Sequence, residues 1–166
     1  MGPRSMAILG LIVALTVALS PVLAIPIGPI RAFPVQHLMN VVTAVLLGPG
    51  AAVLGAFLSS TLRLLLGVGT FFAYPGSLFG ALLAGLFYRR WPSIGSAGLG
   101  EVLGTGFLGS AAAWLLARFL LGGPYAAAAF FYPFLASTLL GAAGAVALLY
   151  ASRPFQALLS ARRERP

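Results

Sequence analysis

The sequence predicts an all-α integral membrane protein in which six transmembrane helices form one bundle, with both termini in the cytoplasm. Of the 166 residues, 60% are hydrophobic and only 7% are charged, and the mean hydropathy is +1.03. A soluble domain carries roughly 25% charged residues, so this chain has too few polar groups to cover itself in water. The apolar runs are long and do not alternate with period two, which favours membrane helices over a β-barrel.

The first three helices are expected at residues 5–24, 37–48 and 50–66. The first has the apolar sequence SMAILGLIVALTVALSPVLA. The second ends at the helix breaker Gly48-Pro49-Gly50, which also begins the third. Because about 20 residues are needed to cross a bilayer core, the second helix is short and should be tilted or completed by the loop before it.

The last three helices are expected at residues 75–90, 96–121 and 126–151. The fourth is also short and begins at a proline. The linker YRRWPSIGS separates it from the fifth, and the sixth begins with the aromatic sequence AAAAFFYPFLAST.

The first apolar segment also has features of a signal peptide. The basic start MGPRS and the small-residue sequence Val22-Leu23-Ala24 fit such a peptide and its cleavage site. The run is long for a signal, and the remaining segments already predict a polytopic protein. A first transmembrane helix is therefore the preferred interpretation.

The arginines predict the orientation of the helices. All ten cationic residues are arginine. With a cytoplasmic N-terminus, Arg31, Arg63 and Arg118 lie at or near the outside. The inside then holds Arg4, Arg89, Arg90, Arg153, Arg162, Arg163 and Arg165. This distribution obeys the positive-inside rule. We expect one membrane domain over residues 1–152 and a basic tail over 153–166 that binds anionic lipid headgroups.

The polar composition argues against an enzyme. The chain has two carboxylates, Glu101 and Glu164, a single histidine, His37, and neither cysteine nor aspartate. These residues cannot build a Ser-His-Asp triad, and they leave little for a metal site or a proton relay. No basic helix interleaved with aromatic residues indicates nucleic-acid binding. We therefore expect no cofactor and no nucleic acid.

Small residues recur every four positions in several helices, where they let helix backbones approach closely. The later rows are Gly80 and Ala84, Gly100 and Gly104, and Gly141 and Ala145. For these rows we expect packing inside the bundle. The row Gly10, Ala14 and Ala18 on the first helix could instead contact a partner protein.

The outer end of the third helix and the loop after it suggest a ligand pocket. Arg63 is either an anchor that reaches the interface or a donor that faces a cavity between helices. Thr70 offers a hydroxyl in the next loop. The candidate aromatic residues of the pocket are Phe72, Tyr74, Trp114 and Phe131. Aromatic walls with a few polar groups suit a small planar ligand, although an interfacial aromatic belt has a similar composition.

Gln36, His37 and Asn40 lie in the first turn of the second helix, at the outer side of the predicted topology. They either cap and close this helix start or line the pocket from above. Glu101 is expected near the inner side, away from the outer arginines. There it would pair with Arg89 or Arg90 or stabilise the start of its helix.

Three stretches closely resemble one family of membrane proteins. They are RAFPVQHLMNVVTAVLLGPG, LRLLLGVGTFFAYPGSLFGALLAGLFYR and GEVLGTGFLG. The sequence resembles the ThiW family over about residues 7–150. The members of this family are substrate-binding S-components of energy-coupling-factor (ECF) vitamin transporters.

The resemblance implies a six-helix S-component in a prokaryotic cell membrane that captures a thiamine precursor, expected to be the hydroxyethylthiazole moiety, from outside. It also implies partners: a transmembrane coupling subunit of the EcfT type and two ATPase subunits, which hydrolyse the ATP. Many S-components dock through an alanine-x-x-x-alanine row on their first helix. Ala14 and Ala18 match that row, and Gly10 extends it.

Two alternatives remain open at this stage. The same fold could bind hydroxymethylpyrimidine, thiamine or a phosphorylated thiazole, since Arg31 and Arg63 suit an anionic ligand. A structural or assembly protein of the membrane would bind no small ligand at all.

Overall fold

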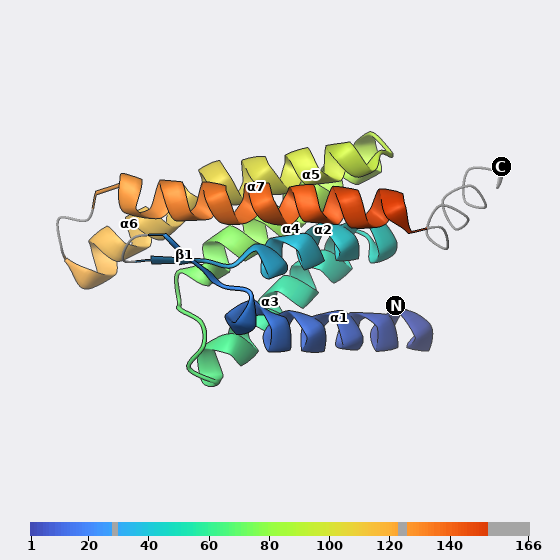
Figure 1. The fold of residues 1–166 in the computed structure, drawn as a ribbon, viewed down its shortest axis with the longest axis horizontal. Helices are drawn as coiled ribbons and strands as arrows, with labels where there is room; N and C mark the ends of the chain where they lie inside the picture. The colour runs from blue at the N-terminus through green and yellow to red at the C-terminus, as the bar shows by residue number, and fades with distance from the viewer. Residues whose placement is uncertain (28–29, 123–125, 153–166) are drawn as a thin grey trace.

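The computed structural model describes residues 1–27, 30–122 and 126–152, and most of them are helical (Figure 1). The helices are α1 (Pro3–Val22), α2 (Pro34–Leu47), α3 (Pro49–Leu65), α4 (Ala73–Arg90), α5 (Ile94–Leu103), the π-helical turn η1 (Gly104–Gly109), α6 (Ser110–Leu121) and α7 (Ala128–Ala151). Because α5, η1 and α6 are continuous, the described chain forms six helical segments at the predicted positions. The predicted tail, 153–166, lies outside the described residues.

Three of these segments are long and apolar enough to cross a membrane by length and composition. They are Pro3–Val22, Ile94–Leu120 and Ala128–Ala151. Two further apolar helices, α2 and α3, are shorter. A membrane protein is therefore well supported, whereas the number of six spans stays a prediction.

The prediction of a purely helical chain is wrong between α1 and α2. Here β1 (Ile25–Ile27) and β2 (Ile30–Ala32) form a short antiparallel hairpin in which Ile25 pairs with Ala32. Isoleucine favours extended backbone because its side chain branches at Cβ, and three isoleucines in six residues supply that preference. Pairing of the two strands satisfies backbone groups that a plain loop would leave open.

The turns at both ends of α3 follow from glycine and proline. Gly48 ends α2 with a φ of 88°, and Pro49 occupies the first turn of α3, where its missing N–H is not needed. At the other end, Gly67 has a φ of 70°. The N–H of Val68 donates to the carbonyl of Arg63, and that of Gly67 to Leu64. These two bonds form a Schellman motif. The glycines at both ends of α3 thus adopt the positive φ that each turn requires.

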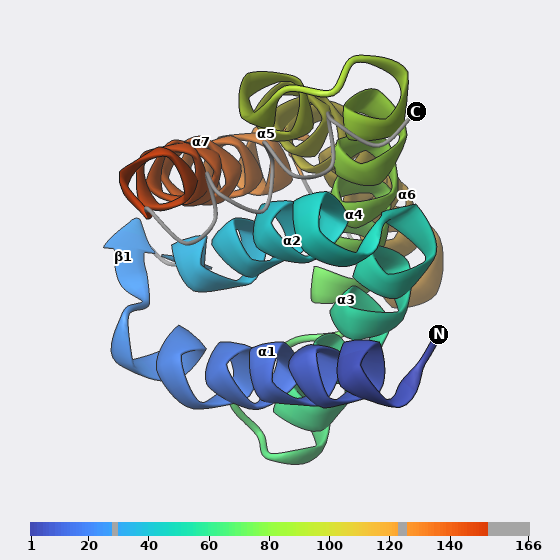
Figure 2. The ribbon, with the colours of Figure 1, turned by 90° about the vertical axis from the view of Figure 1, so that its right-hand side faces the viewer.

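Helix α2 lies at the centre of the bundle, between α1 on one side and α5 and α7 on the other, with α3 and α4 beside it (Figure 2). Its buried Val41 and Val45 pack with Ala142 and Ala145 of α7 in the main apolar core. A central helix contacts almost every other element, so polar residues on α2 can meet partners from several helices.

The small-residue rows of the later helices pack inside the bundle, as predicted. A methyl group added at Gly100 or Gly104 of the α5–η1 segment would meet the backbone of α4, and one added at Gly141 of α7 would meet the start of α2. Such contacts bring helix backbones together where lipid offers no hydrophobic drive for association.

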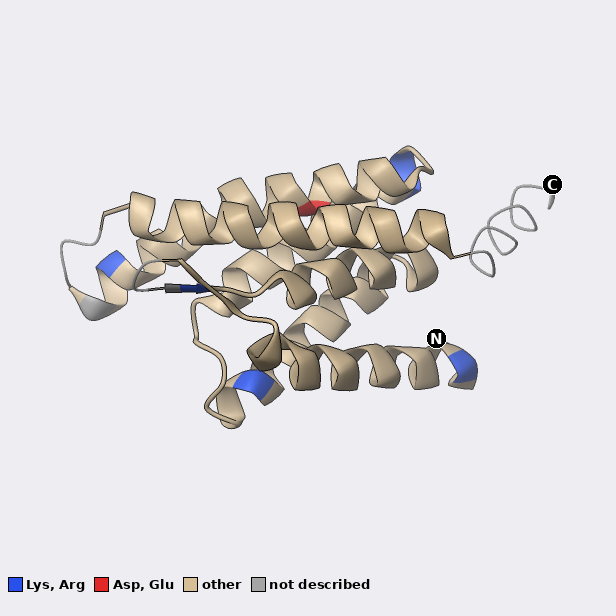
Figure 3. Cartoon of the chain, in the orientation of Figure 1, with Lys and Arg blue, Asp and Glu red and all other residues tan. Residues whose placement is uncertain are grey.

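Most of the described basic residues lie toward the two ends of the bundle, and the one on α3 lies between them (Figure 3). Those at the start of α1 and the end of α4 lie at one end, and those of β2 and α6 lie toward the other. The acidic residue of α5 lies between the two ends. This separation agrees with the predicted grouping of the arginines, while the side that faces the cytoplasm stays a prediction.

Candidate functional site

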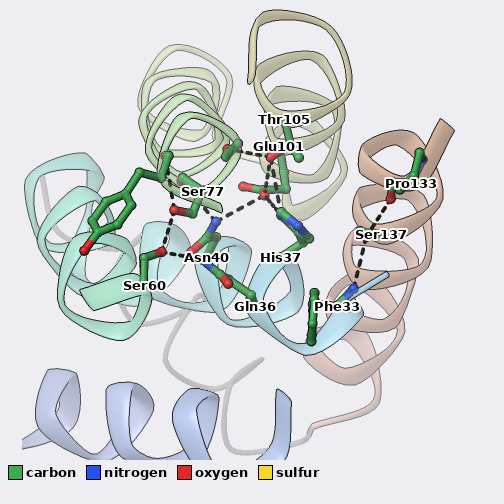
Figure 4. A network of polar contacts seen from close by, with 12 residues as sticks. Phe33, Gln36, His37, Asn40, Ser60, Ser77, Glu101, Thr105, Pro133 and Ser137 are labelled. Carbon is green, nitrogen blue, oxygen red and sulfur yellow. Dashed lines mark hydrogen bonds and ion pairs between the residues drawn. The ribbon is translucent and has the colours of Figure 1, made fainter. Parts of the chain in front are cut away.

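A connected group of buried polar side chains lies between α2, α3, α4 and the α5–η1 segment (Figure 4). We call it the polar cluster. Its members are Gln36, His37, Asn40, Ser60, Arg63, Ser77, Glu101 and Thr105. Polar groups inside a membrane protein are costly unless they find partners, so a cluster of eight is a candidate functional site.

The three α2 residues of the cluster do not cap their own helix. Pro34 begins α2, and no side chain forms a cap there. Gln36, His37 and Asn40 bond instead to residues of α3, α4 and α5. The capping interpretation of these three residues is therefore wrong, and their hydrogen bonds connect helices.

Glu101 is the centre of one half of the cluster. Its Oε1 lies 2.7 Å from His37 Nδ1 and 3.2 Å from Asn40 Nδ2. Thr105 Oγ1 lies 2.9 Å from the same oxygen and 2.9 Å from the carbonyl of Gly76, so its single O–H donates to one of them at a time. Three donor groups thus surround one carboxylate oxygen, and both described hydrogen bonds of His37 use Nδ1.

Arg63 is the centre of the other half. Its Nη1 donates to Gln36 Oε1, and Gln36 Nε2 donates to Ser60 Oγ at 2.8 Å. Ser60 Oγ is 2.9 Å from Ser77 Oγ, and the Ser77 carbonyl accepts from Asn40, which joins the two halves. The ring of Phe33 covers one face of the guanidinium, with 4.3 Å between its centroid and Arg63 Cζ.

Three strongly polar atoms of the cluster have no partner among the described residues. Arg63 Nε and Nη2 donate to nothing, and Glu101 Oε2 accepts nothing. Both side chains are enclosed, with Arg63 1% and Glu101 0% exposed. An unmade hydrogen bond at a buried charged group costs about 1–3 kcal/mol or more. These atoms are therefore where a polar ligand or water would be stabilised most.

Two expectations for the charged residues are wrong. Arg63 does not reach the interface as an anchor, because its guanidinium is buried against Gln36 and Phe33. Glu101 bonds to His37, Asn40 and Thr105 and not to Arg89 or Arg90. The hairpin and the segment after it occupy the chain before α2, so α2 starts part-way along the bundle, level with Glu101.

The side-chain hydrogen bonds and ring contacts of Thr70, Phe72 and Tyr74, in the loop 67–74, do not involve the unpartnered atoms of the polar cluster. Thr70 is exposed. Phe72 packs edge-on against Phe130 of α7, with 5.3 Å between ring centroids. Tyr74 donates its O–H to Thr61 at 2.9 Å. These three residues therefore do not surround the unpartnered atoms.

Trp114 and Phe131 line a second feature, an open cavity of about 490 Å³. We call it the aromatic cavity. Its walls are formed by Phe107, Ser110, Ala111, Trp114, Ala127, Ala128, Phe131 and Tyr132. The π-helical turn η1 connects the two features, since it carries Thr105 of the cluster and Phe107 of the cavity. Such turns are rare and occur frequently at functional sites.

The small-residue row on α1 faces away from the bundle. Gly10, Ala14 and Ala18 are exposed, and a methyl group added at Gly10 would meet nothing within 4 Å. Leu9, Ile12, Val13, Thr16 and Ser20 form the buried face of the helix. The row is thus not used for packing inside the described chain.

Five contributors to the site were not predicted from the sequence. They are Phe33, Ser60, Ser77, Glu101 and Thr105. Ser60 precedes Arg63 by three residues and Glu101 precedes Thr105 by four, spacings that put each pair on one helix face. These two spacings are the features of the sequence from which the two pairs could have been recognised. Among the described residues, no group of three His, Cys, Asp or Glu side chains could hold a metal ion.

The match to a known protein family covers nearly the whole chain. A family model described as thiamine-precursor transporter protein (ThiW) matches residues 6–153. No curated protein matches the sequence.

Proposed function

The chain belongs to the ThiW family of thiamine-precursor transporters, and we propose that it captures the hydroxyethylthiazole moiety of thiamine at the outer face of a prokaryotic cell membrane. In this proposal it is a multi-pass S-component of an ECF importer and has no catalytic residues. The transporter family supplies the class of substrate.

The unpartnered atoms of the polar cluster carry the proposal. Arg63 Nε and Nη2 offer donors to the ring nitrogen or the hydroxyl oxygen of a thiazole alcohol. Glu101 Oε2 offers an acceptor to its O–H. A site that must hydrogen-bond a ligand hydroxyl discriminates strongly against analogues without it, because its own buried polar groups then stay unpaired.

The aromatic residues serve the ring of the ligand. In this proposal Trp114 and Phe131 stack on it in the aromatic cavity, which shares the π-helical turn η1 with the polar cluster. Thr70, Phe72 and Tyr74 belong to the outer loop that borders the path of the ligand. Each aromatic contact contributes about 0.5–1.5 kcal/mol beyond area burial, so capture needs the polar contacts as well.

The exposed row Gly10, Ala14 and Ala18 is the proposed docking surface for the EcfT-type coupling subunit. Small side chains let a second helix approach α1 closely, and this face is free of internal packing. Two ATPase subunits bound to the coupling subunit would then drive toppling of the S-component, which delivers the ligand inward.

Ligand binding to the detergent-purified protein tests the proposal. We expect hydroxyethylthiazole to co-purify, as identified by mass spectrometry, and to raise the unfolding temperature when added back. An analogue with an ethyl group in place of the hydroxyethyl group is the matched control, and it should bind at least tenfold more weakly. Absence of any thiazole, together with no thermal shift, would contradict the proposal and favour a structural membrane protein.

A further inference from the structure

Another open cavity, of about 310 Å³, lies at the end of the bundle where α2 ends and α3 begins. Residues 44–49 line it, together with Gly85, Tyr88, Arg89 and Pro92. Arg89 supplies the charge of this lining, so we call the cavity the basic groove. Its volume is in the range of small-ligand sites, and it shares no residue with the polar cluster or the aromatic cavity.

The positive charge of Arg89 has no acidic partner in the described part of the chain. Glu101 is the acidic residue there, and it is buried inside the bundle. Arg89 is exposed, and Arg90 beside it lies over the ring of Trp91, with 5.3 Å from Cζ to the ring centroid. The start of α1, which carries Arg4, lies at the same end of the bundle (Figure 3). In the described chain this end therefore carries uncompensated positive charge.

An apolar stripe leads along α4 to the basic groove. Phe79, Leu82 and Leu86 are exposed, and Arg89 follows Leu86 by three residues. Spacings of three and four residues put these side chains on one helix face. Because each residue turns an α-helix by about 100°, Arg89 lies between this stripe and Gly85 of the groove. A molecule with an anionic head in the groove can therefore place an apolar tail along α4.

Trp91 indicates that the basic groove lies at the level of the lipid headgroups. It follows α4 directly and is 53% exposed. Tryptophan is enriched at both membrane–water interfaces, and arginine side chains near helix ends extend to the same level. This indication holds whichever side of the membrane this end of the bundle faces.

We propose that the basic groove binds the phosphate of an anionic phospholipid, with Arg89 as its charged contact and the acyl chains along the stripe of α4. A guanidinium matches a phosphate through two parallel hydrogen bonds, and basic pockets between membrane helices bind anionic headgroups. A soluble phosphate compound would fill the groove and leave the stripe uncovered, which favours a lipid. The site is separate from ligand capture and goes beyond the proposed function.

Binding of added lipid to the delipidated, detergent-purified protein tests the proposal, with native mass spectrometry as the measurement. The probes are phosphatidylglycerol, phosphatidylcholine with the same acyl chains, and glycerol phosphate, which has no acyl chain. We expect phosphatidylglycerol to bind at least tenfold more tightly than either of the others. Equal binding of phosphatidylcholine would overturn the preference for an anionic lipid. Equal binding of glycerol phosphate would overturn the lipid as occupant and assign the groove to a soluble anion.

Two variants with the same change of charge separate the groove from general attraction to the membrane. One arginine near an anionic surface contributes about fivefold to binding, so Arg90→Gln should weaken phosphatidylglycerol by no more than that. Arg89→Gln also removes the hydrogen bonds to the phosphate and should weaken it at least tenfold. Equal losses in the two variants would contradict a site at Arg89.

A third variant fills the groove and leaves the charge unchanged. Leu47 lines the cavity and is partly exposed, so the larger side chain of Leu47→Trp should occupy it. We expect at least tenfold weaker phosphatidylglycerol binding, and wild-type affinity in a folded Leu47→Trp protein would place the lipid elsewhere and overturn the proposal. If this variant does not fold, the comparison of Arg89→Gln with Arg90→Gln still decides it.

Discussion

Replacement of Gly100 by alanine should destabilise the bundle, because α4 and α5 are in backbone contact at this residue. An added methyl group would meet the carbonyl of Leu83 and the nitrogen of Ala84. Neither is the end of a flexible side chain, so the helices themselves would have to move apart. Overpacking of this kind costs about 1–3 kcal/mol.

The matched control is Gly95→Ala in the same helix, where the added methyl group meets nothing within 4 Å. Both substitutions gain about 0.5–1 kcal/mol from lower backbone entropy and better helix propensity. The difference between the two variants therefore isolates the contact between α4 and α5. For a chain of this length, about 1–3 kcal/mol corresponds to roughly 2–12 °C in unfolding temperature.

Thermal unfolding of the detergent-purified variants measures that difference. We expect Gly95→Ala to unfold at or above the wild-type temperature and Gly100→Ala below it. A Gly100→Ala protein as stable as Gly95→Ala would show that the two helices do not touch here. Because Glu101 is the next residue, Gly100→Ala should also weaken ligand binding, whereas Gly95→Ala should not.

Three further variants, with one control, test other parts of the structure. His37→Ala removes the 2.7 Å bond to Glu101 and should cost about 1.5–3 kcal/mol in thermal stability and abolish ligand binding; unchanged affinity in a titration would exclude the imidazole as a ligand contact. Leucines at Ala14 and Ala18 together should lower the amount of coupling subunit that co-purifies, without changing ligand affinity. The control Leu139→Phe, at an exposed residue of α7, should change neither quantity. Co-purification of as much coupling subunit with the α1 variant as with the wild-type protein would refute docking at this row. Gly67→Ala forces alanine into a φ of 70° and should cost about 1–2 kcal/mol, measured as a lower unfolding temperature; no loss would mean that the turn can rearrange.

The helical segments could be predicted from the sequence because their signals are local. Continuous apolar runs, the break at Gly48-Pro49-Gly50 and the glycines after α3 each determine structure within a few residues. The hairpin was missed because β1 and β2 are only three residues each, too short to show the alternation of side chains by which a strand is recognised in a sequence.

The partner of His37 could not be predicted, because it depends on the depth of two helices. The sequence predicts that α2 starts at the outer side of the membrane and α5 at the inner side. That prediction places His37 and Glu101 on opposite sides of the membrane. In the structure, 64 residues separate them in sequence and 2.7 Å separates Nδ1 from Oε1. The offset arises because the hairpin and Phe33 precede α2 and shift its start along the bundle. Hydropathy gives the length of a helix but not its depth relative to its neighbours.

Glycine contacts and the polar cluster depend on each other. A methyl group at Gly80 would meet Thr105 and Glu101, and one at Gly141 would meet the backbone and the His37 side chain at the start of α2. The glycines therefore bring α4, α5 and α7 close enough to α2 for short polar side chains to meet across the helices. Since lipid does not drive these helices together, the hydrogen bonds of the cluster in turn hold them at that spacing. A ligand that pairs with Arg63 and Glu101 would then stabilise the packing of the whole bundle. Ligand binding should consequently protect Gly100→Ala against thermal unfolding in proportion to whatever affinity that variant retains.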